Sequence, residues 1–385
     1  MQWLHTEGNQ VKDAFNRTVS LRGGNILRYM GEAGDTWKTV FDSVGQKSMH
    51  TPEWFDKYKA LGVNAIRLNL AYRFLEPNVG TGEYDLNYLQ MIDEVVSWCS
   101  QRNIRILLDC HGLEAGSCNF PVAWFDDVNN QQSWIQWWSF LVERYKNNPT
   151  VCIINLVNEM HWSETWEAEE GLTKYKQMCE KCIDALTAIN PKLVFMVNGA
   201  SEYWDIYHRG VPFIERPNVA FGAMLYYGYM VGEQEEFADM RPFIRQYMDG
   251  NFEAGKAGMY EWFDRDLLGG KDNAPIIISE IGIQYTAPNA QGHPNEEIFL
   301  KDFLQYCKDR HLSFMYYCLM TSSEDASEGF ELYNPTTLEP WQPWGDILKN
   351  SLAQPAMEDD IRFLLLFFGI FLVLVLGFSM IGRKT

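Results

Sequence analysis

The chain has 385 residues, of which 46% are hydrophobic and 15% aromatic, enough for one large barrel or two medium domains around a substantial core. Its net charge of -19 argues against nucleic acid or an anionic membrane surface as a partner, because both would repel it. This charge favours a neutral ligand, and the 14 Trp suggest aromatic surfaces on which sugar rings could stack.

Strands and helices are predicted to alternate along most of the chain. Apolar runs rich in Val, Ile and Leu, bounded by turn residues, predict strands at residues 18–25, 64–70, 104–109, 152–157, 193–198, 219–226, 275–280 and 312–317. Segments with helical periodicity lie between them, at residues 51–60, 86–100, 134–145, 173–189, 232–266 and 296–310. This order predicts an α/β fold, a (β/α)8 TIM barrel.

The cysteines do not form a recognisable metal motif. Cys179 and Cys182 have C-x-x-C spacing inside an expected helix, but no second Cys or His pair at zinc spacing accompanies them. Cys110, Cys152 and Cys318 lie in or next to apolar runs, where buried free thiols are usual. We therefore expect neither a metal nor a cofactor, and the sequence leaves the redox compartment open.

The last part of the chain has a different composition. Residues 363–381 form an almost uninterrupted apolar run without charge, long enough to cross a bilayer as a helix. A buried core helix is the alternative, but it would have to follow a polar linker. We expect a barrel domain at 1–352, a linker at 353–360, a single C-terminal transmembrane helix at 361–381 and a short basic tail at 382–385.

Charges beside this apolar run predict which side of the membrane the barrel occupies. Asp359 and Asp360 precede the run, whereas Arg383 and Lys384 follow it, with Arg362 as the opposing charge. Because Lys and Arg near a spanning helix tend to stay cytoplasmic, we expect the barrel to be extracellular. No secretory signal is visible, which supports the alternative of a tail-anchored protein with its barrel in the cytosol.

Two predicted strands end in a glutamate. The run 152–157 is followed by Asn158 and Glu159, and the run 275–279 is followed by Glu280. Strands buried on both faces do not need such groups for stability, and α/β barrels keep their active sites at the carboxyl ends of their strands. A pair of carboxylates there is typical of enzymes that hydrolyse glycosidic bonds. The alternative is two solvated glutamates with no role in catalysis.

With these residues the chain resembles glycoside hydrolase family 5, the cellulase-like family, over residues 18–348. The resemblance depends on four short motifs that occur in the expected order at predicted strand ends. They are Asn-Ala-Ile-Arg-Leu at 64–68, Leu-Asp-Cys-His at 108–111, Asn-Glu at 158–159 and Ser-Glu-Ile-Gly at 279–282. Each motif is weak alone, but the four together are specific.

The resemblance implies a retaining mechanism. Glu280 would be the nucleophile, and Glu159 would donate a proton to the leaving group and then activate water. Arg67 would lower the pKa of Glu280 through its charge. An arginine that faces a barrel interior could instead belong to a structural ion pair, although its burial would be costly without a purpose.

Three further residues have supporting roles by the same resemblance. Asn158 would hydrogen-bond the sugar 2-OH, and His111 and Tyr227 would be hydrogen-bond donors. His111 could also be an ordinary buried histidine near a loop. Tyr227 belongs to an aromatic cluster with Tyr226 and Tyr229 and could serve in packing.

The chain departs from the family pattern at three positions. Met160 replaces the usual Pro after the acid/base, and Leu225 stands where a His is expected before the strand-six tyrosine. Tyr317 replaces the Trp platform that follows strand eight, and a Tyr ring still stacks on sugar. Together with this residue, the loop tryptophans are the expected stacking positions: Tyr317, Trp124, Trp162 and Trp204.

The leading hypothesis is a membrane-anchored retaining glycosidase that cleaves β-1,4-glucan, with a β-linked polysaccharide or oligosaccharide as partner and the bilayer contacted through residues 361–381. A β-mannanase and a glycosidase acting on glycolipid headgroups are the alternatives within the family. A catalytically inactive carbohydrate-binding barrel is the alternative from another class, although both glutamates are present. A purely structural membrane protein would not need these polar residues at four strand ends.

Overall fold

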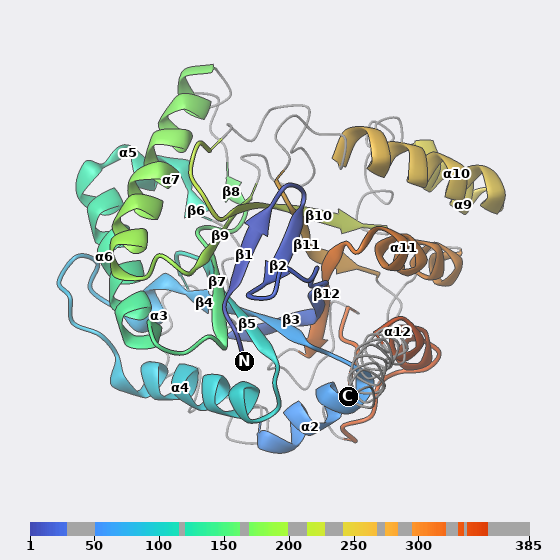
Figure 1. Cartoon of the computed structure of the whole chain (residues 1–385), viewed down its shortest axis with the longest axis horizontal. Helices are drawn as coiled ribbons and strands as arrows, with labels where there is room; N and C mark the ends of the chain where they lie inside the picture. The colour runs from blue at the N-terminus through green and yellow to red at the C-terminus, as the bar shows by residue number, and fades with distance from the viewer. Residues whose placement is uncertain are drawn as a thin grey trace, which may run out of the picture.

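The computed structural model describes residues 1–28, 51–114, 120–161, 169–198, 214–227, 242–267, 274–283, 295–320, 330–334 and 337–352. Eight parallel strands close into a barrel in the order β10-β11-β12-β3-β4-β5-β7-β9 (Figure 1). They are β3 (Arg22–Arg28), β4 (Ala65–Ala71), β5 (Arg105–Gly112), β7 (Val151–Asn155), β9 (Val194–Asn198), β10 (Val219–Tyr226), β11 (Ile276–Gly282) and β12 (Ser313–Met320). The predicted (β/α)8 TIM barrel is confirmed.

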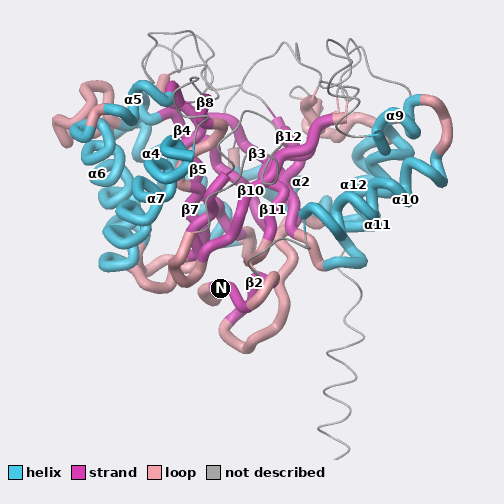
Figure 2. Tube along the Cα trace, turned by 90° about the horizontal axis from the view of Figure 1, so that it is seen from above, coloured by secondary structure: helices cyan, strands magenta, loops and turns pink. Residues whose placement is uncertain are grey.

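Helices surround the barrel, as Figure 2 shows. The longer ones are α2 (Pro52–Leu61), α4 (Leu86–Gln101), α6 (Val128–Tyr145), α7 (Glu169–Ile189), α9 (Pro242–Met248), α10 (Phe252–Trp262), α11 (Glu296–Arg310) and α12 (Trp344–Leu352). Short segments are α3 (Tyr72–Leu75), α5 (Val122–Asp126), η2 (Phe263–Leu267), β6 (Phe120–Pro121) and β8 (Met160–His161). Local sequence sets several ends: the Asp85 carboxylate caps α4, and Gly62 ends α2 with a φ of 104°.

Most tryptophans of the described ranges serve the core rather than a sugar surface. Trp134, Trp137 and Trp138 on α6 are all fully buried. The indole of Trp137 donates to the carbonyl of Tyr72 at 3.2 Å, and that of Trp138 donates to the carbonyl of Leu156 at 2.9 Å. The indole groups therefore tie the α6 helix to the strand ends, and part of the high Trp content has a structural use.

A hairpin that the sequence patterns did not predict lies under the barrel. Strand β1 (Leu4–Glu7) pairs antiparallel with β2 (Gln10–Asp13), and Leu4 and Val11 join the apolar cluster of the barrel interior. The backbone N–H of Thr6 donates to Asn218 Oδ1, just before β10, so the hairpin closes the amino-terminal end of the barrel (Figure 2). The first barrel strand starts at Arg22, later than predicted, because residues 18–21 connect it to this hairpin.

The predicted transmembrane helix at 361–381 lies outside the described residues. Among the helices within the described ranges, none is both long enough and apolar enough to span a bilayer. Part of the predicted helical segment 232–266 also lies outside, and its described part contains α9, α10 and η2.

Seven cysteines of the described ranges are buried free thiols: Cys99, Cys110, Cys152, Cys179, Cys182, Cys307 and Cys318. Burial raises the thiol pKa of six of them: Cys99, Cys110, Cys152, Cys179, Cys182 and Cys307. The pKa is about 12 for Cys152 and for Cys179. We expect Ellman's reagent at pH 8 to label at most Cys118 in the native protein, because thiols that stay protonated and covered react slowly. All eight cysteines should react in guanidinium. Rapid native labelling of several thiols would contradict this packing.

Candidate active site

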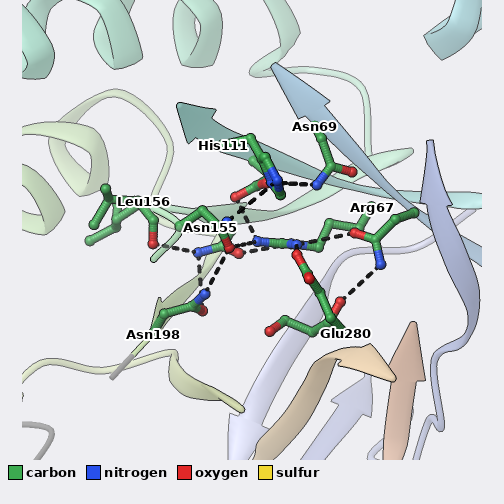
Figure 3. A network of polar contacts seen from close by, with 12 residues as sticks. Arg67, Asn69, His111, Asn155, Leu156, Asn198 and Glu280 are labelled. Carbon is green, nitrogen blue, oxygen red and sulfur yellow. Dashed lines mark hydrogen bonds and ion pairs between the residues drawn. The ribbon is translucent and has the colours of Figure 1, made fainter. Parts of the chain in front are cut away.

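Arg67 is the centre of a polar network at the carboxyl end of the barrel (Figure 3). Its side chain, from β4, is fully buried between two carboxylates. Nη1 lies 2.6 Å from Glu280 Oε1, and Nη2 lies 2.9 Å from Asp109 Oδ1. Burial by itself lowers the pKa of Arg67, but the charges of Asp109 and Glu280 outweigh it, so the pKa is raised overall. The guanidinium is therefore a fixed positive charge.

Three asparagines accept the remaining hydrogen bonds of the guanidinium. Nε donates to Asn155 Oδ1 at 3.0 Å, and Nη1 donates to Asn25 Oδ1 at 3.1 Å. Nη2 donates to Asn158 Oδ1 at 2.6 Å. Together with Glu280, these asparagines accept four hydrogen bonds from the guanidinium, and Asp109 adds a second negative charge beside Nη2, which offsets the cost of burying the cation. Its orientation, and that of its partners, is fixed as a result.

Glu280 is brought into this network by an irregularity in β11. Ile277 faces the barrel interior and Ile278 the helices, so regular alternation would turn Glu280 away from the interior. The register of β11 shifts against β10 and against β12, in both cases between Ile278 and Ile281. The extra residue, Ser279, restores the inward direction for Glu280, as β-bulges do beside active sites.

Glu280 has a donor on each oxygen. Arg67 donates to Oε1, and the hydroxyl of Tyr226, at the end of β10, donates to Oε2. Both contacts fix the orientation of the Glu280 carboxyl group, whose residue is only 2% exposed. Gly282 makes room for this arrangement, because a Cβ there would lie 2.3 Å from a ring atom of Tyr226. The site thus holds the Glu280 carboxyl group in one position.

Tyr226, rather than the predicted Tyr227, contacts Glu280. Tyr227 is fully buried with its ring against Phe299 of α11, at a centroid distance of 4.9 Å. Burial raises the pKa of Tyr227. The supporting role chosen for Tyr227 from the sequence stays a prediction, and the structure adds Tyr226, the last residue of β10, as the donor to Glu280.

His111 and Asn158 are held as neighbours. Asp109 Oδ2 lies 2.7 Å from His111 Nδ1, which assigns the proton to Nδ1 and leaves Nε2 as the acceptor. The amide nitrogen of Asn158 lies 3.4 Å from that Nε2. The backbone N–H of Asn158 donates to the carbonyl of Cys110 at 3.0 Å, which positions this residue although β7 ends at Asn155. The predicted cluster of Arg67, His111, Asn158 and Glu280 is thus assembled in space.

Glu159 follows Asn158 and is half-buried, so it is more open than Glu280. Consecutive placement after Asn158 keeps it at the same end of the barrel as Glu280. For a retaining pair the two carboxyl groups should be roughly 5–5.5 Å apart, and this separation stays a prediction.

The predicted stacking residues have different environments. Tyr317 on β12 is 8% exposed and packs edge-on against Tyr226 and Phe330, with centroid distances of 5.9 Å and 6.0 Å. Trp124 on α5 is partly buried and packs edge-on against Phe125 at 4.9 Å. Trp162 and Trp204 lie outside the described residues. Tyr317 therefore supports Tyr226, next to Glu280.

Polar residues that received no role from the sequence complete the network: Asn25, Asn69, Asp109, Asn155, Asn198 and Tyr226. Each lies inside or at the end of a run that otherwise resembles a buried strand, and this misplaced polarity is the signal that could have found them. Within the described ranges, no group of three or more His, Cys, Asp or Glu is arranged to hold a metal ion.

Replacing Arg67 by lysine should destabilise the protein strongly, because lysine cannot supply five donors in a planar fork. Breaking a buried ion pair of this kind costs about 3–5 kcal/mol. Arg144→Lys is the control: its exposed pair with Asp93 should be worth about 1 kcal/mol or less. Guanidinium unfolding in mild detergent, followed by tryptophan fluorescence, measures both. Equal, small losses would show that the Arg67 network contributes little to stability.

Comparison with known proteins gives a consistent family. The model of the family described as Cellulase (glycosyl hydrolase family 5) matches residues 30–323. An endoglucanase of Paenibacillus polymyxa is 27% identical over 219 residues, which span 52% of this chain and 53% of that enzyme. Endoglucanase G of Acetivibrio thermocellus is 22% identical, over 92% of this chain and 71% of the relative. The chain therefore matches between about half and about seven tenths of these relatives' length.

Solved structures show the same fold. The β-glucanase SdGluc5_26A of Saccharophagus degradans superimposes with a TM-score of 0.64 at 20% identity, covering 91% of this chain and 93% of that one. An endocellulase of Pyrococcus horikoshii superimposes with a TM-score of 0.65 at 16% identity, covering 91% and 99%. Because the family model matches most of the barrel, including every strand from β4 to β11, the chain belongs to the cellulase family, glycosyl hydrolase family 5.

Proposed function

We propose that this protein hydrolyses β-1,4-glucan with retention of anomeric configuration. The observation that carries the proposal is Glu280, buried with Arg67 on one oxygen and Tyr226 on the other, at the same end of the barrel as the Asn158–Glu159 pair. Relatives named endoglucanases support β-1,4-glucan as the substrate class. So does the Pyrococcus horikoshii endocellulase, which has been solved in complex with cellotetraose.

In this mechanism Glu280 attacks the anomeric carbon, and Glu159 protonates the leaving oxygen. The Arg67 guanidinium lies against Glu280 Oε1, and its fixed fork holds the attacking oxygen in position. Glu159 is the more open of the two carboxyl groups, and the negative charge of Glu280 favours its protonated form before the first step. That charge disappears when the glycosyl–enzyme bond forms, so Glu159 can then accept a proton from water.

Asn158 is suited to contact the sugar ring. Its carbonyl oxygen accepts from Arg67 and from Asn198, which turns its amide nitrogen, a donor, toward the His111 side of the site. A donor in this position would hydrogen-bond the 2-OH, an interaction that strengthens at the transition state. The stacking roles predicted from the sequence for Tyr317, Trp124, Trp162 and Trp204 would add binding of further sugar units.

The experiment for the substrate class uses the full-length protein in mild detergent with a panel of substrates. We expect release of reducing ends from carboxymethyl cellulose and cello-oligosaccharides, and much slower release from β-mannan and from glycosylceramides. Faster cleavage of mannan or of glycolipid would replace the β-glucan proposal with one of those alternatives. Binding to these glycans without cleavage would favour the inactive carbohydrate-binding barrel.

Two variants test the division of roles and serve as controls for contaminating activity. Glu280→Ala should abolish turnover, and azide or formate should restore part of it by replacing the nucleophile. Glu159→Ala should lose about 10²–10⁴-fold on cello-oligosaccharides, but much less on dinitrophenyl cellobioside, whose leaving group needs no proton. Equal losses on both substrates, without rescue, would contradict these roles.

Tyr226 and Tyr227 form a matched pair for the donor to Glu280. Tyr226→Phe removes a hydrogen bond to a charged group worth about 1.5–3 kcal/mol, so kcat should fall roughly 10- to 100-fold. Tyr227→Phe should leave kcat nearly unchanged, because its ring packs against Phe299 away from Glu280. Steady-state kinetics on one cello-oligosaccharide measures both. A larger loss of kcat for Tyr227→Phe would show that Tyr227, as predicted from the sequence, is the supporting hydrogen-bond donor.

We also propose that the domain at 1–352 is tethered by a linker at 353–360 and a transmembrane helix at 361–381, with the tail 382–385 in the cytoplasm and the catalytic domain outside. The apolar run and the basic residues after it support this arrangement.

The side of the membrane can be tested with protease on intact cells that express the full chain. We expect the catalytic domain to be digested while a cytosolic marker protein stays intact, because only the outside is accessible. A catalytic domain that is protected until the cells are lysed would place it in the cytosol, as in a tail-anchored protein.

A further inference from the structure

The last described helix ends at the face of the barrel opposite the catalytic mouth. Leu352, the final residue of α12, packs against Gly62: a Cβ on Gly62 would lie 2.9 Å from the Leu352 carbonyl carbon. Gly62 ends α2 and is followed within three residues by the start of β4. Leu352 is therefore beside the amino ends of the barrel strands, whereas Glu280 and Asn158 are at the carboxyl ends.

The same face carries an exposed aromatic side chain. Phe15, just after β2, is 66% exposed. The other Phe, Tyr and Trp side chains whose burial is described are buried or partly buried. Asp13 holds the turn, because its carboxylate accepts from the backbone N–H of Phe15 at 2.8 Å and of Arg17 at 3.1 Å. The Arg17 guanidinium carbon lies 5.2 Å from the Phe15 ring centroid. Arg17 is paired with Asp13 Oδ2 at 2.8 Å, so the exposed aromatic ring, rather than a net positive charge, is the feature of this face that suits a membrane interface.

The height of the barrel and the length of the linker limit how the domain can sit. Helix α6 has 18 residues and runs from the mouth to the amino-terminal face, so these ends are about 27 Å apart. The proposed linker 353–360 has eight residues, and a flexible chain of that length spans about 16 Å on average. Even fully extended they span about 26–29 Å. A barrel with its mouth on the bilayer would require a nearly straight linker along its side.

We propose that the amino-terminal face of the barrel, which carries the β1–β2 hairpin and the exposed Phe15, lies on the lipid bilayer and that the catalytic mouth faces the water. The inference rests on the anchor proposed above, and it determines from which side the substrate reaches the site. The enzyme acts on glucan that arrives from the aqueous side, and sugar headgroups of its own membrane do not reach Glu280.

The test compares two side chains that are equally exposed on opposite faces. Phe15 and Val128, the latter at the mouth end of α6, are both 66% exposed, and neither belongs to the catalytic network. Phe15→Cys and Val128→Cys are made in full-length protein that carries Cys118→Ser and labelled with the fluorophore NBD. The labelled proteins are reconstituted into phosphatidylcholine vesicles with nitroxide-labelled lipid, and flotation separates vesicle-bound protein.

The expected result is several-fold stronger quenching by the nitroxide lipid at position 15 than at position 128, with iodide in the buffer showing the reverse order. Equal quenching, or stronger quenching at position 128, would overturn the orientation. Protein that does not float with the vesicles would overturn the anchor and the orientation together. Because none of these readouts requires turnover, loss of the proposed glycosidase activity would be recognised separately.

A second measurement tests the consequence for the substrate. In vesicles, the unlabelled full-length protein should cleave soluble cello-oligosaccharides as fast as in detergent, and should leave a cellobiosyl lipid in its own bilayer intact. The same lipid, presented in detergent micelles, controls for the chemistry of the bond. Efficient cleavage of the lipid in the vesicle but not of the soluble glucan would contradict a mouth that faces the water.

Discussion

The buried guanidinium of Arg67 is the interaction on which the catalytic end of this barrel depends. A cation without water needs negative charge and hydrogen-bond acceptors, and the surrounding strands supply both. Asp109 and Glu280 provide the charge, and three asparagine oxygens complete the set. Each partner is in turn oriented by Arg67, so the same contacts that make burial tolerable also preorganise the site.

The two halves of the barrel interior differ in polarity. Near the amino ends it is apolar, lined by residues such as Leu107, Val194 and Ile277, and the β1–β2 hairpin closes it with Leu4 and Val11. Near the carboxyl ends the inward positions are amides, carboxylates and the guanidinium. The lower half stabilises the fold by excluding water, which leaves the upper half available for chemistry.

This division also gives the molecule two functionally different ends. Catalytic groups are at the carboxyl end, and the hairpin and the end of α12 are at the amino end. In the membrane-anchored arrangement proposed above, a tether at the amino end would leave the mouth open to a long polymer, since neither the linker nor the bilayer would cross the path of that substrate.

Sequence patterns determined much of this protein. The alternation of apolar strands and amphipathic helices predicted the barrel, because the two periodicities are local properties of the chain. Glutamates after two buried runs led to the prediction of a carboxylate pair, since a buried strand of a barrel does not by itself need a carboxylate at its end. The hairpin was missed because its short strands have little hydrophobic pattern and gain their stability from the barrel beneath which they pack.

Tertiary structure alone decided which side chains meet. Strands covered on both faces show no alternation of polar and apolar residues, so the inward direction of Tyr226 rather than Tyr227 was hidden. Glu280 points inward only because the bulge at Ser279 shifts the alternation of inward and outward side chains along β11 by one residue. The asparagines around Arg67 come from β3, from β7 and from the segment after β7, and their contacts join residues up to 91 positions apart. No local pattern encodes such distances, because they follow from the closure of the barrel.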